Sequence, residues 1–196
     1  MKKLLITGFE PFGGESINPS WEAVSLLPSQ IGEYTVNKLL VPVEFSVGAE
    51  AVKKEADRWS PDVIISVGQA GGRAAVSVEM VGLNLRYASI PDNGGNQPRD
   101  IPVIEGEEAA IFTTLPARRM AERIANEGIP AVVSYSAGAY VCNDLFYTLL
   151  SCYKGTQTKV GFIHIPYSKE QGKEPSMELE SLVRALAVAI ESISED

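Results

Sequence analysis

The chain has 196 residues, of which 45% are hydrophobic and 21% are charged, and its formal net charge is −8 at pH 7. This length supports a single domain, residues 1–196, with a full hydrophobic core, and the composition is that of an ordinary globular protein. The acidic balance, without a basic patch interleaved with aromatic residues, argues against nucleic acid or an anionic membrane as a partner.

Strands and helices alternate along the sequence. In chain order we expect a strand at 2–7, a helix at 18–27, a strand at 34–42, a helix at 46–59, strands at 63–68 and 75–87, a helix at 116–127, a strand at 131–136, a helix at 142–153, a strand at 159–165 and a helix at 176–193. Asn18 before Pro19 is a favourable helix start, and the apolar run 63–68 is typical of a strand buried on both faces. This order predicts an α/β fold, a three-layer α/β/α sandwich with a mixed, mostly parallel sheet.

Two details of these elements carry specific expectations. The alternating segment 75–87 predicts one strand with an irregularity at Gly82. In the helix at 142–153, the spacing of Leu145, Leu149 and Cys152 predicts an inward apolar face.

No segment has the length of a membrane-spanning helix, and the N-terminal apolar run breaks at Gly8, short of a signal-peptide core. The only two cysteines, Cys142 and Cys152, lie ten residues apart in one predicted helix. That separation is about 15 Å of rise, too far for a disulfide. Free thiols indicate a reducing compartment, so we expect a cytoplasmic protein.

Four segments leave a strand and enter a glycine-rich or polar turn: 7–14, 68–73, 136–143 and 164–168. In open α/β sheets, functional groups gather where strands end and helices begin. We therefore expect these four segments to line one crevice.

Cys142 opens the helix that follows the 136–141 loop. The free N–H groups and the dipole of a helix N-terminus favour a thiolate and could hold an oxyanion. The alternative is a small buried hydrophobic side chain, the ordinary role of a free cysteine, and this second interpretation is the better one for Cys152.

His164 is the only histidine of the chain and ends the strand 159–165. It is therefore the only histidine that could act as a base near neutral pH, and it could activate Cys142 if the two lie close together. The alternative is a histidine whose ring nitrogens are bonded locally within the sheet. Without a C-x-x-C or H-x-x-x-H pattern we expect no metal site and no cofactor.

Glu79 lies in VSVEMV, between apolar neighbours. A buried carboxylate needs a partner, and His164 is a good candidate, although Glu79 could equally face solvent on an edge strand. Asp92 is a second possible orienting residue or a plain turn residue.

The glycine-rich segments GFEPFGG and GQAGGR match neither the phosphate loop nor the dinucleotide fingerprint. Two rival functions remain: a small-molecule-binding α/β protein that uses GQAGGR for phosphate, and an inactive scaffold. The glycines let backbone approach a ligand, and Phe9 and Phe12 could flank an apolar slot or belong to the core.

Taken together, the segments 8–20, 66–73, 78–84, 90–98, 136–143 and 161–166 resemble, in order and spacing, the pyrrolidone carboxyl peptidase (pyroglutamyl peptidase I) family. The resemblance implies a cysteine peptidase that removes N-terminal pyroglutamate from peptides through a thioester, with Cys142 as nucleophile, His164 as base and Glu79 as third catalytic residue. It implies a lactam pocket lined by Phe9, Phe12 and the backbone near Gln69, a mixed α/β sandwich, and a homo-oligomer, either tetramer or dimer.

The sequence departs from the family pattern at one position. Many members have an arginine directly before Ile-Pro-Asp, where this chain has Ser89. Arg86 lies three residues earlier and would point to the opposite face of a strand, so it is a poor substitute.

Overall fold

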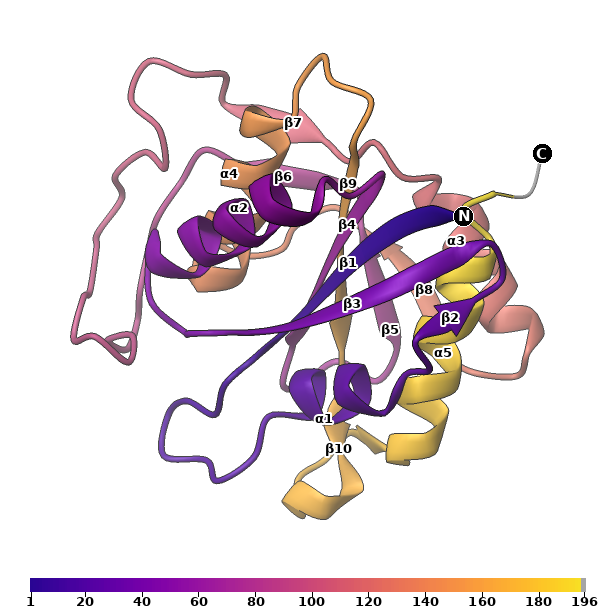
Figure 1. The fold of residues 1–196 in the computed structure, drawn as a ribbon. Coiled ribbons are helices and arrows are strands. Elements are labelled where there is room, and N and C mark those ends of the chain that lie inside the picture. Colours follow the sequence, from indigo (N-terminus) through magenta and orange to yellow (C-terminus); the bar gives the residue numbers. More distant parts are fainter. Residues whose placement is uncertain (195–196) are drawn as a thin grey trace.

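A mixed seven-stranded sheet forms the centre of the computed structural model, which describes residues 1–194 (Figure 1). Its strand order is β2-β3-β1-β4-β9-β5-β8. The strands are β1 (Lys2–Phe9), β2 (Gln30–Ile31), β3 (Tyr34–Val41), β4 (Val63–Gln69), β5 (Val76–Glu79), β8 (Ala131–Ser134) and β9 (Lys159–Ile165). Neighbours pair in parallel except β2 with β3 and β5 with β9, so the predicted mixed, mostly parallel sheet is confirmed.

Helices cover both faces of this sheet, which gives the predicted three layers (Figure 1). The helices are α1 (Pro19–Leu26), α2 (Val47–Trp59), α3 (Ala117–Asn126), α4 (Val141–Cys152) and α5 (Leu179–Glu191). One apolar core lies between the sheet and α1, α3 and α5, and a second lies between the sheet and α2 and α4. In the described residues, none of these helices is both long and apolar enough to cross a membrane.

The first helix shows how local sequence sets an element boundary. Asn18 caps α1, because its side chain accepts a hydrogen bond from the Ser20 N–H at 3.0 Å, and Pro19 occupies the first helical position. The Ser20 hydroxyl in turn accepts from the Phe9 N–H, which ties α1 to the end of β1. The predicted start of this helix is thereby confirmed.

The segment 75–87 differs from the prediction of one irregular strand. It forms β5 and then β6 (Val81–Leu83), which leaves the main sheet and pairs antiparallel with β7 (Ala110–Phe112). Met80 is the turning point, since its N–H donates to Ser134 and its carbonyl accepts from Thr113. At Gly82 the reason for glycine is packing: a Cβ there would lie 3.2 Å from the Cα of Tyr147 on α4.

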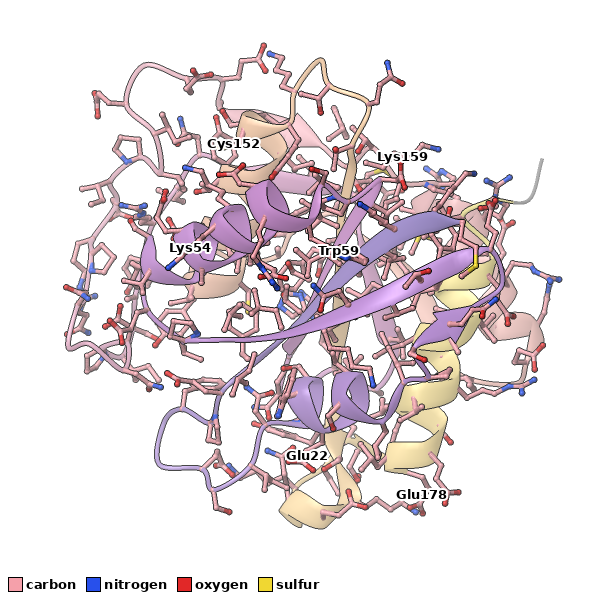
Figure 2. The ribbon with its side chains drawn as sticks, in the orientation of Figure 1. Glu22, Lys54, Trp59, Cys152, Lys159 and Glu178 are labelled. Carbon is pink, nitrogen blue, oxygen red and sulfur yellow. The ribbon has the colours of Figure 1, made fainter. Side chains whose placement is uncertain are left out.

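Two further predictions are corrected at helix ends. The last helix begins at Leu179 instead of Ser176, because Ser176 and Met177 form β11, which pairs with β10 (Tyr167–Ser168). Cys152 is exposed, not part of an inward face, and it is the last residue of α4 (Figure 2). Leu145 and Leu149 are buried as predicted.

Candidate active site

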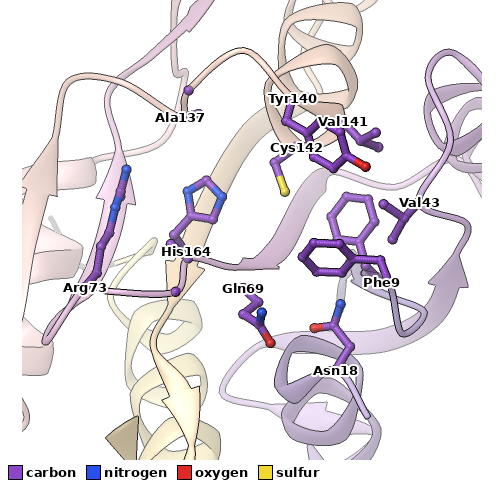
Figure 3. A pocket seen from close by; sticks show the side chains of 14 residues that line it. Phe9, Asn18, Val43, Gln69, Arg73, Ala137, Tyr140, Val141, Cys142 and His164 are labelled. Atoms are coloured by element: carbon purple, nitrogen blue, oxygen red, sulfur yellow. The ribbon is translucent and has the colours of Figure 1, made fainter. Parts of the chain in front are cut away.

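A pocket of about 280 Å³ opens where β1, β4 and β9 end and α4 begins (Figure 3). Each of the four segments predicted to line one crevice contributes to it. The lining residues are Phe9, Phe12, Asn18, Val43, Gln69, Ala70, Gly71, Arg73, Ala137, Gly138, Tyr140, Val141, Cys142 and His164. This volume lies just below the usual range for ligand sites and suits a small ring.

The register of three neighbouring strands brings the polar groups together. His164 on β9 pairs with Gly68 on β4, and paired residues point to the same face of a sheet. The missing side chain of Gly68 leaves room for sulfur, since a Cβ there would lie 2.8 Å from Cys142 Sγ. Cys142 and His164 thus share one face and one pocket, as Figure 3 shows.

Cys142 is the second residue of α4, so it lies in the first helical turn as predicted. Burial raises the pKa of Cys142 to about 12, the negative charge of Glu79 adds to the increase, and the positive charge of Arg73 opposes it. Burial of the thiol thus opposes the thiolate that the helix N-terminus favours.

His164 is 3% exposed, and its Nδ1 lies 2.7 Å from Glu79 Oε1. Burial lowers the pKa of the imidazole, against the raising effect of the Glu79 hydrogen bond and charge. Because a carboxylate only accepts, Nδ1 carries the proton of the neutral ring and Nε2 is the basic nitrogen. This is the tautomer that a base for Cys142 requires.

Glu79 is completely buried, so the alternative of a solvent-facing edge residue is wrong. Burial opposes ionisation, but hydrogen bonds and charge from His164, with further bonding from Ser134 and Arg73, hold the pKa of this carboxyl below its usual value. Glu79 therefore stays a carboxylate at neutral pH and fixes the His164 ring in position.

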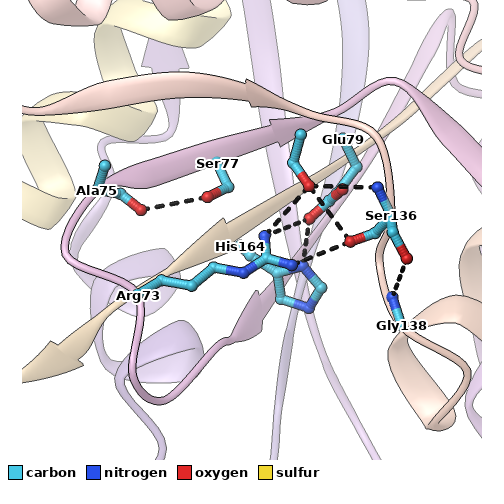
Figure 4. A network of polar contacts seen from close by, with 8 residues as sticks. Arg73, Ala75, Ser77, Glu79, Ser136, Gly138 and His164 are labelled. Carbon is cyan, nitrogen blue, oxygen red and sulfur yellow. Dashed lines mark hydrogen bonds and ion pairs between the residues drawn. The ribbon is translucent and has the colours of Figure 1, made fainter.

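Arg73 is a component of this site that the sequence argument missed. Its Nη1 donates to Glu79 Oε1 at 2.7 Å, and its Nη2 donates to the Ser136 carbonyl at 2.9 Å (Figure 4). The side chain is one-third exposed at the pocket wall. The only signal in the sequence is a lone arginine at the end of GQAGGR, a loop that the sequence argument treats either as backbone close to a ligand or as a phosphate site.

The predicted substrate residues Phe9, Phe12 and Gln69 all line the pocket. Phe9 is also part of the core, where its ring packs against Phe162 at 6.4 Å between centroids, so both interpretations of it hold. Phe12 packs against Tyr140 at 6.3 Å, and Tyr140 is an aromatic wall residue that the sequence argument did not identify.

Asp92 and Arg86 lie outside the pocket lining. Asp92 is a turn residue whose carboxylate accepts from the N–H groups of Phe45 and Asn96. The Arg86 guanidinium pairs with Asp144 at 2.5 Å, which agrees with the prediction that it does not replace a pocket arginine at Ser89. Within residues 1–194 no group of three or more His, Cys, Asp or Glu side chains could hold a metal ion.

The sequence model of the family described as pyroglutamyl peptidase matches residues 2–196. A pyrrolidone-carboxylate peptidase of Thermococcus kodakarensis is 45% identical over 99% of this chain and 97% of its own, and one of Bacillus cereus is 46% identical over 97% and 92%. Among solved structures, pyroglutamyl peptidase I of Bacillus amyloliquefaciens aligns with a TM-score of 0.95 at 44% identity, covering 98% and 97%. Pyrrolidone carboxyl peptidase of Thermococcus litoralis aligns at 0.94 and 37% identity, covering 98% and 93%.

Proposed function

Because this chain belongs to the pyroglutamyl peptidase family and is a hydrolase of N-terminal pyroglutamyl residues, we propose that it works as a cysteine exopeptidase through a thioester acyl-enzyme. Cys142 is the nucleophile, His164 the base and Glu79 the residue that orients the base. Membership of this family argues against the two rival interpretations, a phosphate-binding protein and an inactive scaffold.

The observation that carries this proposal is the chain of groups across β4, β9 and β5. The sulfur of Cys142 sits over Gly68, His164 lies beside it on the next strand, and Glu79 bonds the far side of the imidazole at 2.7 Å. A nucleophile, a base and an orienting carboxylate in this order are the requirements for acyl transfer.

In the first half-reaction, His164 Nε2 takes the thiol proton as the sulfur attacks the pyroglutamyl carbonyl carbon. The carbonyl π electrons move to oxygen, where N–H groups of the first turn of α4 and of the glycine loops stabilise the oxyanion. The oxyanion electrons then re-form the carbonyl and the C–N bond breaks. The imidazolium gives its proton to the departing amine, which leaves a thioester on Cys142.

In the second half-reaction, a water molecule takes the place of the amine. His164 removes one proton from the water as its oxygen attacks the thioester carbon. The C–S bond breaks, the sulfur regains its proton from the imidazolium, and pyroglutamic acid is released. The enzyme returns to the neutral thiol and imidazole with which it began.

Charge balance gives Arg73 a part in the first step. When the tetrahedral intermediate forms, a negative oxyanion and the Glu79 carboxylate face a single imidazolium, so this buried group would carry net charge −1. The Arg73 guanidinium, 2.7 Å from Glu79, restores neutrality. Burial makes such compensation important, since an unbalanced charge is costly away from water.

The pocket chemistry supports a neutral N-terminal residue as substrate. In the described part of the chain, the lining includes no aspartate or glutamate, so an α-ammonium group would find no counter-charge there. The rings of Phe9, Phe12 and Tyr140 offer apolar walls, and a flat lactam adds one acceptor and one donor to be satisfied. Proline lacks the lactam carbonyl and should be a poor substitute.

The test compares the two cysteines on one helix. Cys142→Ala should abolish hydrolysis of a fluorogenic pyroglutamyl amide, whereas Cys152→Ser, a change at the exposed end of α4, should keep most activity. In the Cys152→Ser protein, iodoacetamide should inactivate stoichiometrically by labelling Cys142, and 2-pyrrolidone should slow the reaction. Near-normal turnover by Cys142→Ala would end the proposal.

We also propose that the protein is cytoplasmic and assembles as a homo-oligomer, either a tetramer or a dimer. Both cysteines are free, which suits a reducing compartment. Light scattering of the purified protein measures the assembly directly, and a monomer across the micromolar range would contradict it.

A further inference from the structure

The chain segment directly after His164 turns back and supports the opposite wall of the pocket. β10 (Tyr167–Ser168) leads into a single 3-10 turn, η1 (Lys169–Gln171), whose last residue is Gln171. The Gln171 side chain reaches Gln69, which lines the pocket at the end of β4. Gln171 itself is not part of the pocket lining.

Two hydrogen bonds of the segment 167–171 fix the orientation of the Gln171 and Gln69 side-chain amides. The Ser168 backbone N–H can only donate, and it donates to Gln171 Oε1 at 3.1 Å. The amide nitrogen of Gln171 must then lie on the other side, where it donates to Gln69 Oε1 at 2.9 Å. Gln69 consequently has its oxygen engaged, and its own NH₂ group is the end left for a ligand.

We propose that Gln171 is a positioning residue that makes Gln69 present a hydrogen-bond donor to the lactam carbonyl of the substrate. The inference rests on the proposed function, in which a pyroglutamyl ring occupies this pocket. A glutamine side chain turned by 180° would present its oxygen to the lactam oxygen, and two acceptors would face each other. Gln171 excludes that arrangement, so it sets specificity without touching substrate.

Two further contacts fix the segment 167–171 in place. The Ser168 hydroxyl accepts from the Gln171 backbone N–H, which completes a capping box together with the side-chain bond. The Tyr167 ring packs directly over Gly71, at a place where any side chain would collide with it. Residues that follow His164 therefore contact both ends of the pocket segment 69–71: Gln171 bonds Gln69, and Tyr167 packs on Gly71. The Gln69 NH₂ group thus keeps a fixed position relative to His164.

The test uses Gln171→Glu, Gln69→Leu and the double variant, with Glu170→Gln as a matched control on the exposed side of the same turn. In Gln171→Glu, the carboxylate that replaces the amide retains the acceptor for the Ser168 N–H, so the capping box stays, but it cannot donate to Gln69. Gln69 then turns its NH₂ toward this carboxylate and its oxygen toward the pocket.

We expect Gln171→Glu and Gln69→Leu each to raise KM for a pyroglutamyl amide about tenfold or more, with a smaller change in kcat. Protection of Cys142 against iodoacetamide by 2-pyrrolidone should weaken by a similar factor, which reports binding without turnover. The alkylation rate without 2-pyrrolidone should stay unchanged, and Glu170→Gln should behave as wild type.

The double variant separates positioning from a general structural effect. If Gln171 acts only through Gln69, Gln171→Glu should add little to KM once Gln69 is leucine. A KM in the double variant that equals the product of the two single increases would overturn the proposal. An unchanged KM in Gln171→Glu would also overturn it. Failure of the proposed function has a different signature, because the wild-type protein itself would then neither hydrolyse the amide nor be protected by 2-pyrrolidone.

Discussion

The sulfur of Cys142 occupies the space that a side chain on Gly68 would fill. An ideal Cβ on Gly68 would lie 2.8 Å from Sγ and 2.9 Å from the Phe162 ring. Gly68 is also the register partner of His164. Because Gly68 has no methyl group, the thiol can pack against β4 next to the position of His164. The glycine is thus required by close approach, not by backbone conformation.

Gly68→Ala should therefore lower kcat/KM by about a hundredfold or more, because the sulfur must move by a substantial part of an ångström. The added methyl group should also reduce the free energy of unfolding by about 1–3 kcal/mol. Gly161→Ala is the control for an added methyl group in the sheet that does not reach the thiol. Its Cβ would meet Leu115 on the opposite face of the sheet, away from Cys142. Enzyme kinetics and thermal unfolding of both variants test this, and normal turnover by Gly68→Ala would contradict it.

The sequence located the reacting groups because each carried a local signal. His164 is the sole histidine, Cys142 starts a helix, and Glu79 is a carboxylate in an apolar strand. The alternation of strands and helices was sufficient to predict the three layers, with a sheet between two layers of helices. The structure brings all three side chains to one site, while their catalytic roles stay predictions.

The features that were missed depend on strand register or on side chains that reach across the chain. Arg73 bonds a carboxylate on the next strand, and Gln171 bonds Gln69 from more than a hundred positions away. Gly68 acquires its role only when β4 and β9 are aligned. The change of sheet at Met80 was hidden because β5 and β6 are both apolar, and periodicity does not say which sheet a strand joins.

Glu79→Gln tests the orienting carboxylate. The amide keeps the size of the side chain but loses the charge that stabilises the imidazolium, and its NH₂ can donate to Nδ1, which places the proton on the wrong nitrogen of His164. We expect kcat/KM to fall by about 10³-fold or more, with KM changed little. Steady-state kinetics measures this, and circular dichroism checks that the fold is kept. A loss of less than about fivefold would show that His164 needs no carboxylate partner.

Arg73→Met tests charge balance. The positive charge of Arg73 opposes the rise in the pKa of Cys142 and adds to the decrease in the pKa of His164, so removing it should raise both pKa values. A higher imidazole pKa leaves less neutral base at a given pH, and the acid limb of kcat/KM should move to higher pH. Activity at neutral pH should fall about tenfold or more.

Two further variants separate the charge of Arg73 from its geometry. Arg73→Lys should recover part of the pH profile, since charge is kept while the fork of hydrogen bonds is lost. Arg58→Met, which removes an exposed arginine at the end of α2, should leave the profile unchanged. An Arg73→Met profile that superimposes on the wild-type profile would refute the charge-balance argument.

The pH dependence of Cys142 alkylation distinguishes a neutral resting pair from a pre-formed thiolate–imidazolium pair. Burial raises the pKa of Cys142 to about 12 and lowers that of His164 below 6.5, and both shifts favour the neutral forms. In the Cys152→Ser protein, the iodoacetamide rate should therefore keep rising with pH through the alkaline range. Hydrolysis should already be near its maximum at neutral pH, because only the imidazole must be unprotonated. A pre-formed ion pair would instead give an alkylation plateau that begins in the acid range, where its thiolate is already formed, and that plateau would assign proton transfer to a step before substrate binds.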